Sequence, residues 1–220
     1  MLSIPSSTTL LPSHIVFVSS HYPLKTYFAI KTRATFQKYT KMHGYGFYYD
    51  IDEPDEKTER SLHYRRCVSI EKASRLYPDA KWFVWVDSDV YVNDYSSRIE
   101  ELIDFSDEQI LYHLFHENGG WGQFPINTGV KCVNRSALQW EKCVWDLRNT
   151  EPWTQYPYEQ KTIYEYVLPI IGARKYRIHD PYKLNCIIKA YPDKVQYSTF
   201  AHMCASTEKE RNEIMRNIYI

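Results

Sequence analysis

The stretch Trp82-Phe-Val-Trp-Val-Asp-Ser-Asp89 (WFVWVDSD) decides what kind of fold this sequence adopts. Its first five residues are all apolar, which is typical of a strand buried on both faces. Two carboxylates follow at once, and Val90-Tyr-Val92 continue the apolar run. Acidic side chains in such surroundings are costly unless they are paired or bind a cation. The stretch therefore predicts a buried strand that leads into a metal site.

Segments that fit strands alternate with segments that fit helices on both sides of this stretch. We expect strands at 14–20, 46–49, 109–115 and 127–133, and helices at 24–43, 61–76, 96–105, 136–148 and 157–168. Further expected elements are strands at 175–178 and 194–199, and a last helix opened by the capping pair Thr207 and Glu210. The alternation predicts a single α/β domain over residues 1–220, with helices on both faces of a sheet and a loose start at 1–13.

Composition excludes some classes of function. Lys and Arg number 27, as do Asp and Glu, whereas nucleic-acid binders usually carry a basic excess. No apolar run approaches the roughly 20 residues of a membrane span. The five cysteines show no CxxC spacing, so reduced thiols in the cytoplasm (of a host cell, for a viral protein) are the simplest interpretation. The alternative is a lumenal Golgi domain without its anchor, in which Cys132 and Cys143 could pair.

Polar residues gather where the expected strands end, and ligands bind there in open α/β sheets. Ser19 and Ser20 end the first strand, and two Asp-x-Asp pairs follow the next two strands. Asp87 and Asp89 are flanked by apolar residues and are interpreted as ligands of Mg²⁺ or Mn²⁺. The pair at 50 and 52 leads into an acidic stretch that fits a solvated loop. The metal interpretation requires that both acids face a cleft and that no buried Lys or Arg neutralises them; capping acids at a strand-end turn are the alternative.

Four segments resemble glycosyltransferase family 34, which uses nucleotide-sugar donors. They are His43-Gly-Tyr45, Tyr64-Arg-Arg66, the stretch 82–89, and Asn127-Thr-Gly-Val130 followed by a Trp140–Trp145 helix and Glu159-Gln160. The likeness covers roughly residues 14–205. The chain is much shorter than the anchored Golgi members, and Glu159 stands where the family has Asp. It also resembles small glycosyltransferase domains encoded by large algal viruses.

The resemblance implies a GT-A fold with a mixed, mostly parallel sheet. It further implies a divalent cation, usually Mn²⁺, a nucleotide-sugar donor, for which UDP is favoured, and a glycan or glycoprotein acceptor. The family's His-Phe-x-Gly motif supplies a third metal ligand, and His202 in Phe200-Ala-His-Met-Cys204 stands at that place although the order is altered.

The site residues are assigned as follows. The metal ligands are Asp87, Asp89 and His202. The residues that bind the nucleotide or the donor sugar are Ser19, Ser20, Arg66, Asp87, Ser88, Asn127, Gly129 and Lys209. Glu159 and Gln160 are the catalytic candidates: Gln160 would stabilise positive charge in a retaining transfer, and Glu159 would be the base in an inverting one.

Two other functions stay open from the sequence. A nucleotidyl or phosphoryl transferase also uses paired acids, but it usually needs a phosphate-binding glycine loop, and no Walker motif is present. A sugar-binding module without catalysis is supported only by the aromatic content, which includes 20 Tyr.

Overall fold

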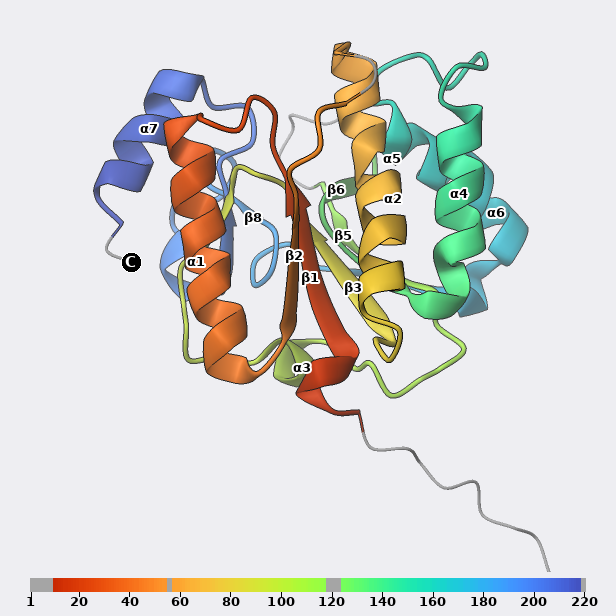
Figure 1. Cartoon of the computed structure of the whole chain (residues 1–220), viewed down its shortest axis with the longest axis horizontal. Helices are drawn as coiled ribbons and strands as arrows, with labels where there is room; N and C mark the ends of the chain where they lie inside the picture. The colour runs from red at the N-terminus through yellow and green to blue at the C-terminus, as the bar shows by residue number, and fades with distance from the viewer. Residues whose placement is uncertain (1–9, 55–56, 118–123, 219–220) are drawn as a thin grey trace, which may run out of the picture.

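The computed structural model describes residues 10–54, 57–117 and 124–218. Six strands form a central sheet in the order β2-β1-β3-β6-β5-β7 (Figure 1). Their bounds are β1 Ile15–Ser20, β2 Gly46–Asp50, β3 Trp82–Val86, β5 Tyr112–His116, β6 Ile126–Asn134 and β7 Tyr176–His179. β1 pairs in parallel with both β2 and β3, and β5 pairs in parallel with β7. Only β6 runs the other way, antiparallel to β3 and β5, so the expected mixed, mostly parallel sheet is confirmed.

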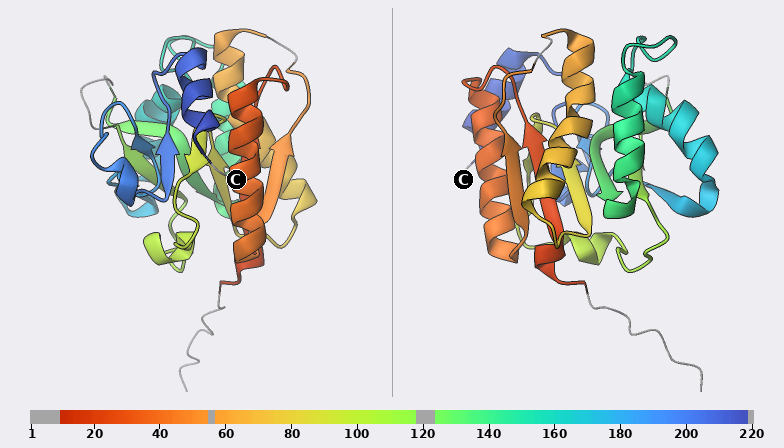
Figure 2. Two further views of the ribbon diagram at one scale, coloured as in Figure 1. Left: turned by 90° about the vertical axis from the view of Figure 1, so that its left-hand side faces the viewer. Right: turned by 45° about the vertical axis from the view of Figure 1, so that its right-hand side comes forward.

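Helices cover both faces of this sheet, as the alternating pattern predicts (Figures 1 and 2). α1 (Tyr27–His43) and α7 (Glu208–Arg216) pack together on one side, and α2 (Glu59–Leu76) and α4 (Leu138–Leu147) pack together on the other. Along β1, Ile15 and Phe17 enter one apolar core, and Val16 and Val18 enter the other. The strand is therefore buried on both faces, which is what its continuous apolar run predicts.

Local sequence signals correctly predict where several helices begin or end. α1 ends at Gly44, whose φ of 78° lies in the left-handed region that favours glycine. Thr207 and Glu210 form the expected capping box at the start of α7. Asn134 accepts a hydrogen bond from the Ser136 backbone N–H and caps the helical turn before α4.

The sequence reasoning is wrong for two elements, and a third, the helix at 157–168, is confirmed with an interruption by a π-helical turn. The expected helix at 96–105 is only one turn, α3 (Ile99–Leu102). The expected helix at 157–168 consists of α5 (Glu159–Thr162), a π-helical turn (Ile163–Val167) and α6 (Leu168–Ile171). The expected strand at 194–199 contains a 3-10 turn, Val195–Tyr197, because the extended chain begins only at Phe200.

A second, three-stranded sheet was not expected. It consists of β4 (Val90–Val92), β9 (Phe200–His202) and β8 (Cys186–Ile187) in the order β4-β9-β8. Strands of two or three residues are too short to show an alternating pattern. β4 follows directly after the Asp87-Ser88-Asp89 turn, so this small sheet brings distant chain segments to the end of β3.

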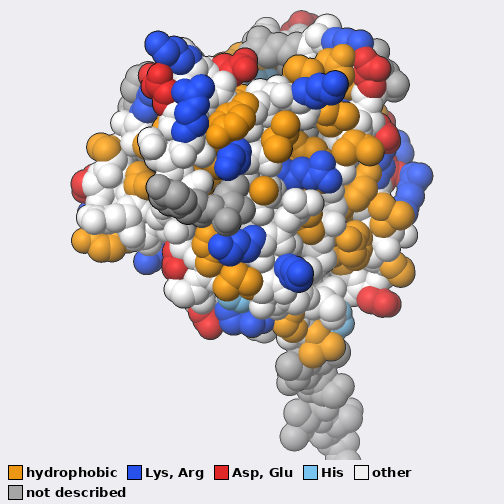
Figure 3. Space-filling model, turned by 60° about the vertical axis from the view of Figure 1, so that its left-hand side comes forward, with side chains coloured by type: hydrophobic (Ala, Val, Ile, Leu, Met, Phe, Trp, Pro, Cys, Tyr) orange, Lys and Arg blue, Asp and Glu red, His pale blue; other side chains and the backbone are white. Residues whose placement is uncertain are grey.

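Other features agree with the composition. On the face shown in Figure 3, basic side chains are scattered among apolar and neutral ones. All five cysteines are free. Across the described residues, no helix combines the length and the apolar character that crossing a bilayer requires. Of the stretch 1–13, residues 1–9 lie outside the described residues, and Pro12–His14 form a 3-10 turn.

Candidate active site

Asp87, Asp89 and His202 lie together beyond the end of β3. Each offers one ligand atom, and the three atoms lie within 4.8 Å of one another. The turn after β3 carries the two acids, and β9 carries the histidine. Because β9 pairs with β4 so that Val90 lies opposite His202, the histidine is held beside Asp89. The structure thus brings together the three residues that the sequence predicted as metal ligands.

A hydrogen bond at Nδ1 of His202 fixes the tautomer of the ring. Nδ1 lies 2.9 Å from Oδ1 of Asn185, and Asn185 Nδ2 donates to Asn127 Oδ1 at 3.0 Å. Because Asn185 Oδ1 can only accept, Nδ1 of His202 carries the proton. Nε2 is then the ring nitrogen that faces Asp89 Oδ1, at 3.2 Å. Either a proton on Nε2 or a metal ion can therefore join these two atoms.

Gly129 leaves the space that His202 occupies. A Cβ atom at Gly129 would lie 2.2 Å from Cε1 and 2.8 Å from Nδ1 of the His202 ring. The Gly129 backbone N–H also donates to Asn127 Oδ1 at 2.9 Å. The family-derived Asn-x-Gly signature therefore supports the histidine in this structure, in addition to lining a pocket.

Two adjoining pockets meet at the acids, and His63, Arg66, Asp87, Asp89 and Arg211 line both. We call them pockets A and B. Pocket A, about 300 Å³, is completed by Ser20, His21, Tyr22, Leu62, Arg65, Trp85 and Ser88. Pocket B, about 160 Å³, is completed by Glu117, Asn127, Thr128, Gly129, Tyr156, Pro157, Glu159, Gln160, His202 and Cys204. The requirement that the acids face a cleft is met.

The requirement that no buried cation neutralises the acids is not met for Asp87. Arg66, which is 5% exposed, lies 3.2 Å from Asp87 Oδ1, and Trp85 Nε1 donates to the same oxygen at 2.6 Å. Asp89 pairs with Arg211 at 2.8 Å. Burial alone would raise the pKa of Asp89, but His202 and Arg211 outweigh burial and hold that pKa below its usual value.

Arg66 does not neutralise Asp87 exclusively, because Arg66 belongs to a chain of ion pairs in which acidic and basic side chains alternate. Glu141 contacts Lys131 at 2.7 Å, Lys131 contacts Glu159 at 2.6 Å, Glu159 contacts Arg66 at 3.3 Å, and Arg66 contacts Asp87. Three acids face two bases, so the chain carries a net negative charge. Buried ions are tolerated only when they are paired in this way.

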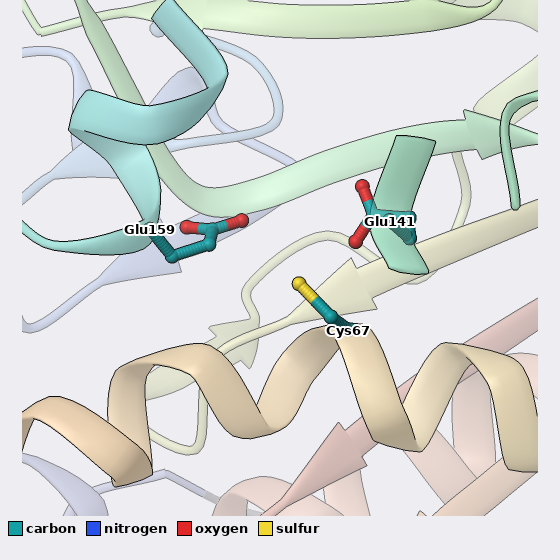
Figure 4. A group of neighbouring side chains, drawn as sticks. All are labelled: Cys67, Glu141 and Glu159. Carbon is teal, nitrogen blue, oxygen red and sulfur yellow. The ribbon is translucent and has the colours of Figure 1, made fainter. Parts of the chain in front are cut away.

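A second group with metal-binding residue types lies inside this chain of charges. Cys67 of α2, Glu141 of α4 and Glu159 of α5 point toward one another (Figure 4). The ammonium group of Lys131, which is fully buried, already contacts both carboxylates. Burial raises the pKa of the Cys67 thiol well above its usual value. This group is therefore an ion cluster of the core and not a second metal site.

Glu159 and Gln160 lie at the start of α5, after Tyr158, whose φ of 56° is uncommon outside glycine. Glu159 Oε1 contacts Lys131, and Oε2 accepts from the Thr128 hydroxyl at 2.9 Å. Gln160 Oε1 accepts from the Thr128 backbone N–H at 3.1 Å, and its Nε2 donates to Glu117 Oε2 at 3.0 Å. Both predicted catalytic residues thus line pocket B, but their polar atoms are largely engaged by the protein.

The predicted nucleotide-binding residues are only partly brought together. Ser20 and Ser88 line pocket A, whereas Ser19 is buried beside it and is not among its lining residues. Lys209 is exposed on α7 and lines neither pocket. Arg211, two residues later, is the residue of α7 that reaches the acids. Residues two apart on a helix point in different directions, so the basic residue was sought at the wrong position.

His21 was missed by the sequence reasoning. Its Nδ1 bonds to the Ser88 hydroxyl at 2.8 Å, and its buried Nε2 has no hydrogen-bond partner among the described residues. Burial, followed by Arg211 and Arg65, lowers the pKa of His21 to about 4, although Asp89 opposes the shift. The ring is therefore neutral at pH 7. The signal was available, since His21 directly follows the two serines at the end of β1.

The other Asp-x-Asp pair serves the fold. Asp50 is buried and is held by the Ser69 hydroxyl at 2.7 Å, by Lys72 at 3.3 Å and by Arg65 at 3.4 Å. Lys72 also contacts Asp52 at 2.6 Å. This arrangement agrees with the preference for Asp87 and Asp89.

The fold and the site define the class of the protein: it is a glycosyltransferase with a GT-A fold. Residues 19–134 match the model of the galactosyl transferase GMA12/MNN10 family, and the chain belongs to this family. No curated protein matches the sequence significantly. Among solved structures, a glycosyltransferase involved in the glycosylation of the major capsid of PBCV-1 is 50% identical, with 93% of this chain and 99% of that chain covered and a TM-score of 0.90.

Two further structures are much less similar. An active-site mutant of LgtC is 14% identical over 94% of this chain and 96% of its own, with a TM-score of 0.47. The protein A197 from STIV is 8% identical over 69% of this chain and 76% of its own, with a TM-score of 0.42. Similarity at this level carries no argument about function.

Proposed function

We propose that the protein transfers a sugar from a nucleoside diphosphate sugar, with UDP favoured, to a glycan or glycoprotein acceptor, and that Asp87, Asp89 and His202 hold a divalent cation for this reaction. One observation carries the proposal: Asp87, Asp89 and His202 each offer a ligand atom within 4.8 Å of one another, and Nε2 of His202, whose Nδ1 is engaged by Asn185, faces a carboxylate oxygen of Asp89 at 3.2 Å. Two carboxylates and an imidazole suit Mn²⁺, and Mg²⁺ is the alternative.

The cation would supply positive charge to the oxygens of the departing diphosphate. Arg66 pairs with Asp87, Arg211 pairs with Asp89, and both arginines line the two pockets, so their guanidinium groups are placed to contact phosphate oxygens. Arg211 takes the role first assigned to Lys209.

Pocket A is the proposed site of the nucleoside. Ser20, Ser88 and the neutral His21 offer hydroxyl groups and a free ring nitrogen to the hydroxyls or the base of a nucleoside. The pocket contains no glycine-rich phosphate loop among its lining residues, which favours a sugar transferase over a nucleotidyl transferase.

Pocket B is the proposed site of the donor sugar, because it adjoins the acids on the side of Asn127, Gly129 and Gln160. The 50% identity to a protein that takes part in capsid glycosylation supports a protein-linked glycan as the acceptor. The five free cysteines support a reducing compartment such as the cytoplasm.

A thermal-shift panel tests this function. The melting temperature of the purified protein is measured with UDP, GDP, ADP or CMP, each with and without Mn²⁺. In a second assay the protein is incubated with UDP-glucose, UDP-galactose, UDP-xylose or UDP-N-acetylglucosamine, and the release of UDP from each donor is measured. We expect UDP to stabilise the protein only when Mn²⁺ is present, and at least one donor to be turned over. Stabilisation by UDP that ignores the metal would contradict the proposed cation, and turnover of nucleoside triphosphates without sugar transfer would favour a nucleotidyl transferase.

A further inference from the structure

Pocket B has an exposed aromatic ring at its edge. Of the large apolar side chains in the described residues, Tyr156 is the most exposed, at 71%, and it lines this pocket. The lining residues Thr128, Glu159 and His202 are, in contrast, buried. The pocket therefore runs from a buried floor beside the acids to an aromatic ring in contact with solvent.

Two further rings continue this aromatic surface. The Tyr158 ring lies edge-on to the Tyr156 ring, with 5.8 Å between the centroids and 84° between the planes. Tyr158 also packs against His63, with 5.2 Å between the centroids and 37° between the planes. His63 lines both pockets, so the three rings extend from the edge of pocket B to the place where the pockets adjoin. An exposed apolar surface that continues into a pocket is typical of a ligand-binding groove.

The segment that carries Tyr156 is held to the rest of the fold. The hydroxyl of the buried Tyr64 donates to the carbonyl oxygen of Trp153 at 2.8 Å. The backbone N–H of Tyr158 donates to the carbonyl oxygen of Gln155, also at 2.8 Å, and closes a turn around Tyr156. A ring that is already positioned loses little conformational freedom when a ligand stacks on it.

We propose that this aromatic surface is the acceptor subsite, and that the Tyr156 ring stacks on the apolar face of a sugar ring of the acceptor glycan. This inference rests on the proposed function. The donor sugar is attached to the diphosphate and therefore occupies the floor beside the acids, whereas the acceptor enters pocket B from solvent, across its exposed edge. An aromatic ring with a polar tip suits a ligand that is apolar on its face and polar at its rim. Tyr156 binds and orients the acceptor and takes no part in the bond changes.

The test measures release of UDP from the panel donor that the wild type hydrolyses fastest, with methyl glycosides of glucose, galactose, xylose, mannose, rhamnose and fucose as acceptor probes. A glycoside that accepts the sugar accelerates the release and yields a disaccharide, which mass spectrometry detects. For Tyr156→Ala we expect the KM for this glycoside to rise about 3- to 10-fold, and the Kd for UDP with Mn²⁺ to stay within about threefold of the wild type. Tyr156→Phe keeps the ring, so its KM for the glycoside should stay within about twofold of the wild type.

Tyr197→Ala is the matched control, because the Tyr197 side chain is 63% exposed, belongs to the 3-10 turn before β9 and is not among the lining residues of either pocket. This variant should behave as the wild type.

Three results would overturn the inference and leave the proposed function standing. They are an unchanged KM for the glycoside in Tyr156→Ala, an equal rise of this KM in Tyr156→Phe and Tyr156→Ala, and a loss of UDP binding in Tyr156→Ala, which would show a structural role. A wild type that hydrolyses donors but is accelerated by none of the glycosides would overturn the inference in the same way. A wild type that neither binds UDP with Mn²⁺ nor releases UDP from any donor would overturn both.

Discussion

Nε2 of His202 lies 3.2 Å from Oδ1 of Asp89, although β3 and β9, which place these residues, belong to different sheets. The pairing of β4 with β9 makes the connection, since Val90 lies opposite His202. The small sheet therefore places an imidazole beside the two acids at the end of β3. The predictions below follow from the groups that hold this arrangement.

Replacing Gly129 by alanine should displace His202. The added Cβ would lie 2.2 Å from the imidazole, which must move away from Asp89. We expect the affinity for Mn²⁺ to fall at least about tenfold and the free energy of unfolding to fall by roughly 1–3 kcal/mol. Gly46→Ala is the matched control, because its Cβ would also be crowded, at 2.8 Å from Val16, but away from the pockets. Equal Mn²⁺ affinity in the two variants, measured by calorimetry, would argue against the role of Gly129.

Asn185→Leu should weaken the metal site through the histidine. The substitution removes the acceptor of the His202 Nδ1 proton, which fixes the ring and its tautomer. Loss of such a supporting hydrogen bond typically costs about 10- to 100-fold in metal affinity. Asn93→Leu removes hydrogen bonds to Val195 and Ser198 beside the same small sheet and serves as the control. If both variants bind Mn²⁺ equally well, the Asn185 hydrogen bond does not support the site.

The two sheets differ in how far their strands could be predicted from the sequence. The continuous apolar run of β3 and the turn residues around α1 predicted their elements because burial and local chemistry decide them. β4, β8 and β9 are formed by tertiary pairing alone, so their order could not be read from a pattern. His202 was placed in the site by family resemblance, whereas its contacts with Asn185 and Asp89 required the structure.

The charged residues of the site were likewise only partly predictable from the sequence. Asp87 and Asp89 could be found because acidic side chains between two apolar stretches are costly unless they are paired or bind a cation. Lys131 carried a similar signal, a charge inside the apolar run of β6, which the sequence reasoning did not use. That Arg66 pairs with Asp87 depends on how α2 packs against β3 and β6, and no spacing in the sequence reveals it.

Lys131→Met should destabilise the protein strongly. The substitution leaves Glu141 and Glu159 buried without the ammonium group that lies within 2.7 Å of both. Removing one partner of a buried ion pair costs about 3–5 kcal/mol. Lys142→Met, which removes the exposed pair with Asp146, should change the stability little. Urea unfolding at pH 7 measures both, and a Lys131 variant as stable as the Lys142 variant would refute the importance of the chain of charges.

Acid should destabilise the fold partly through His113. Burial, together with His179 and Arg177, lowers the pKa of this histidine to about 3 from 6.5. Between these two values the unfolded chain binds the proton and the folded chain does not, so stability falls as the pH falls below 6.5. At pH 5 the loss from this one group is about 2 kcal/mol. The variant His113→Asn should lose correspondingly less stability between pH 7 and pH 5 in urea unfolding; an equal loss in both proteins would show that His113 is protonated in the folded state.

Titration calorimetry of UDP, with and without Mn²⁺, on the wild type and on Asp89→Ala tests the central claim most directly. We expect the wild type to bind UDP much more tightly when Mn²⁺ is present, and the variant to lose this metal-dependent gain because one carboxylate ligand is gone. Binding of UDP to Asp89→Ala with the same dependence on Mn²⁺ as in the wild type would contradict the assignment of the cation to Asp87, Asp89 and His202.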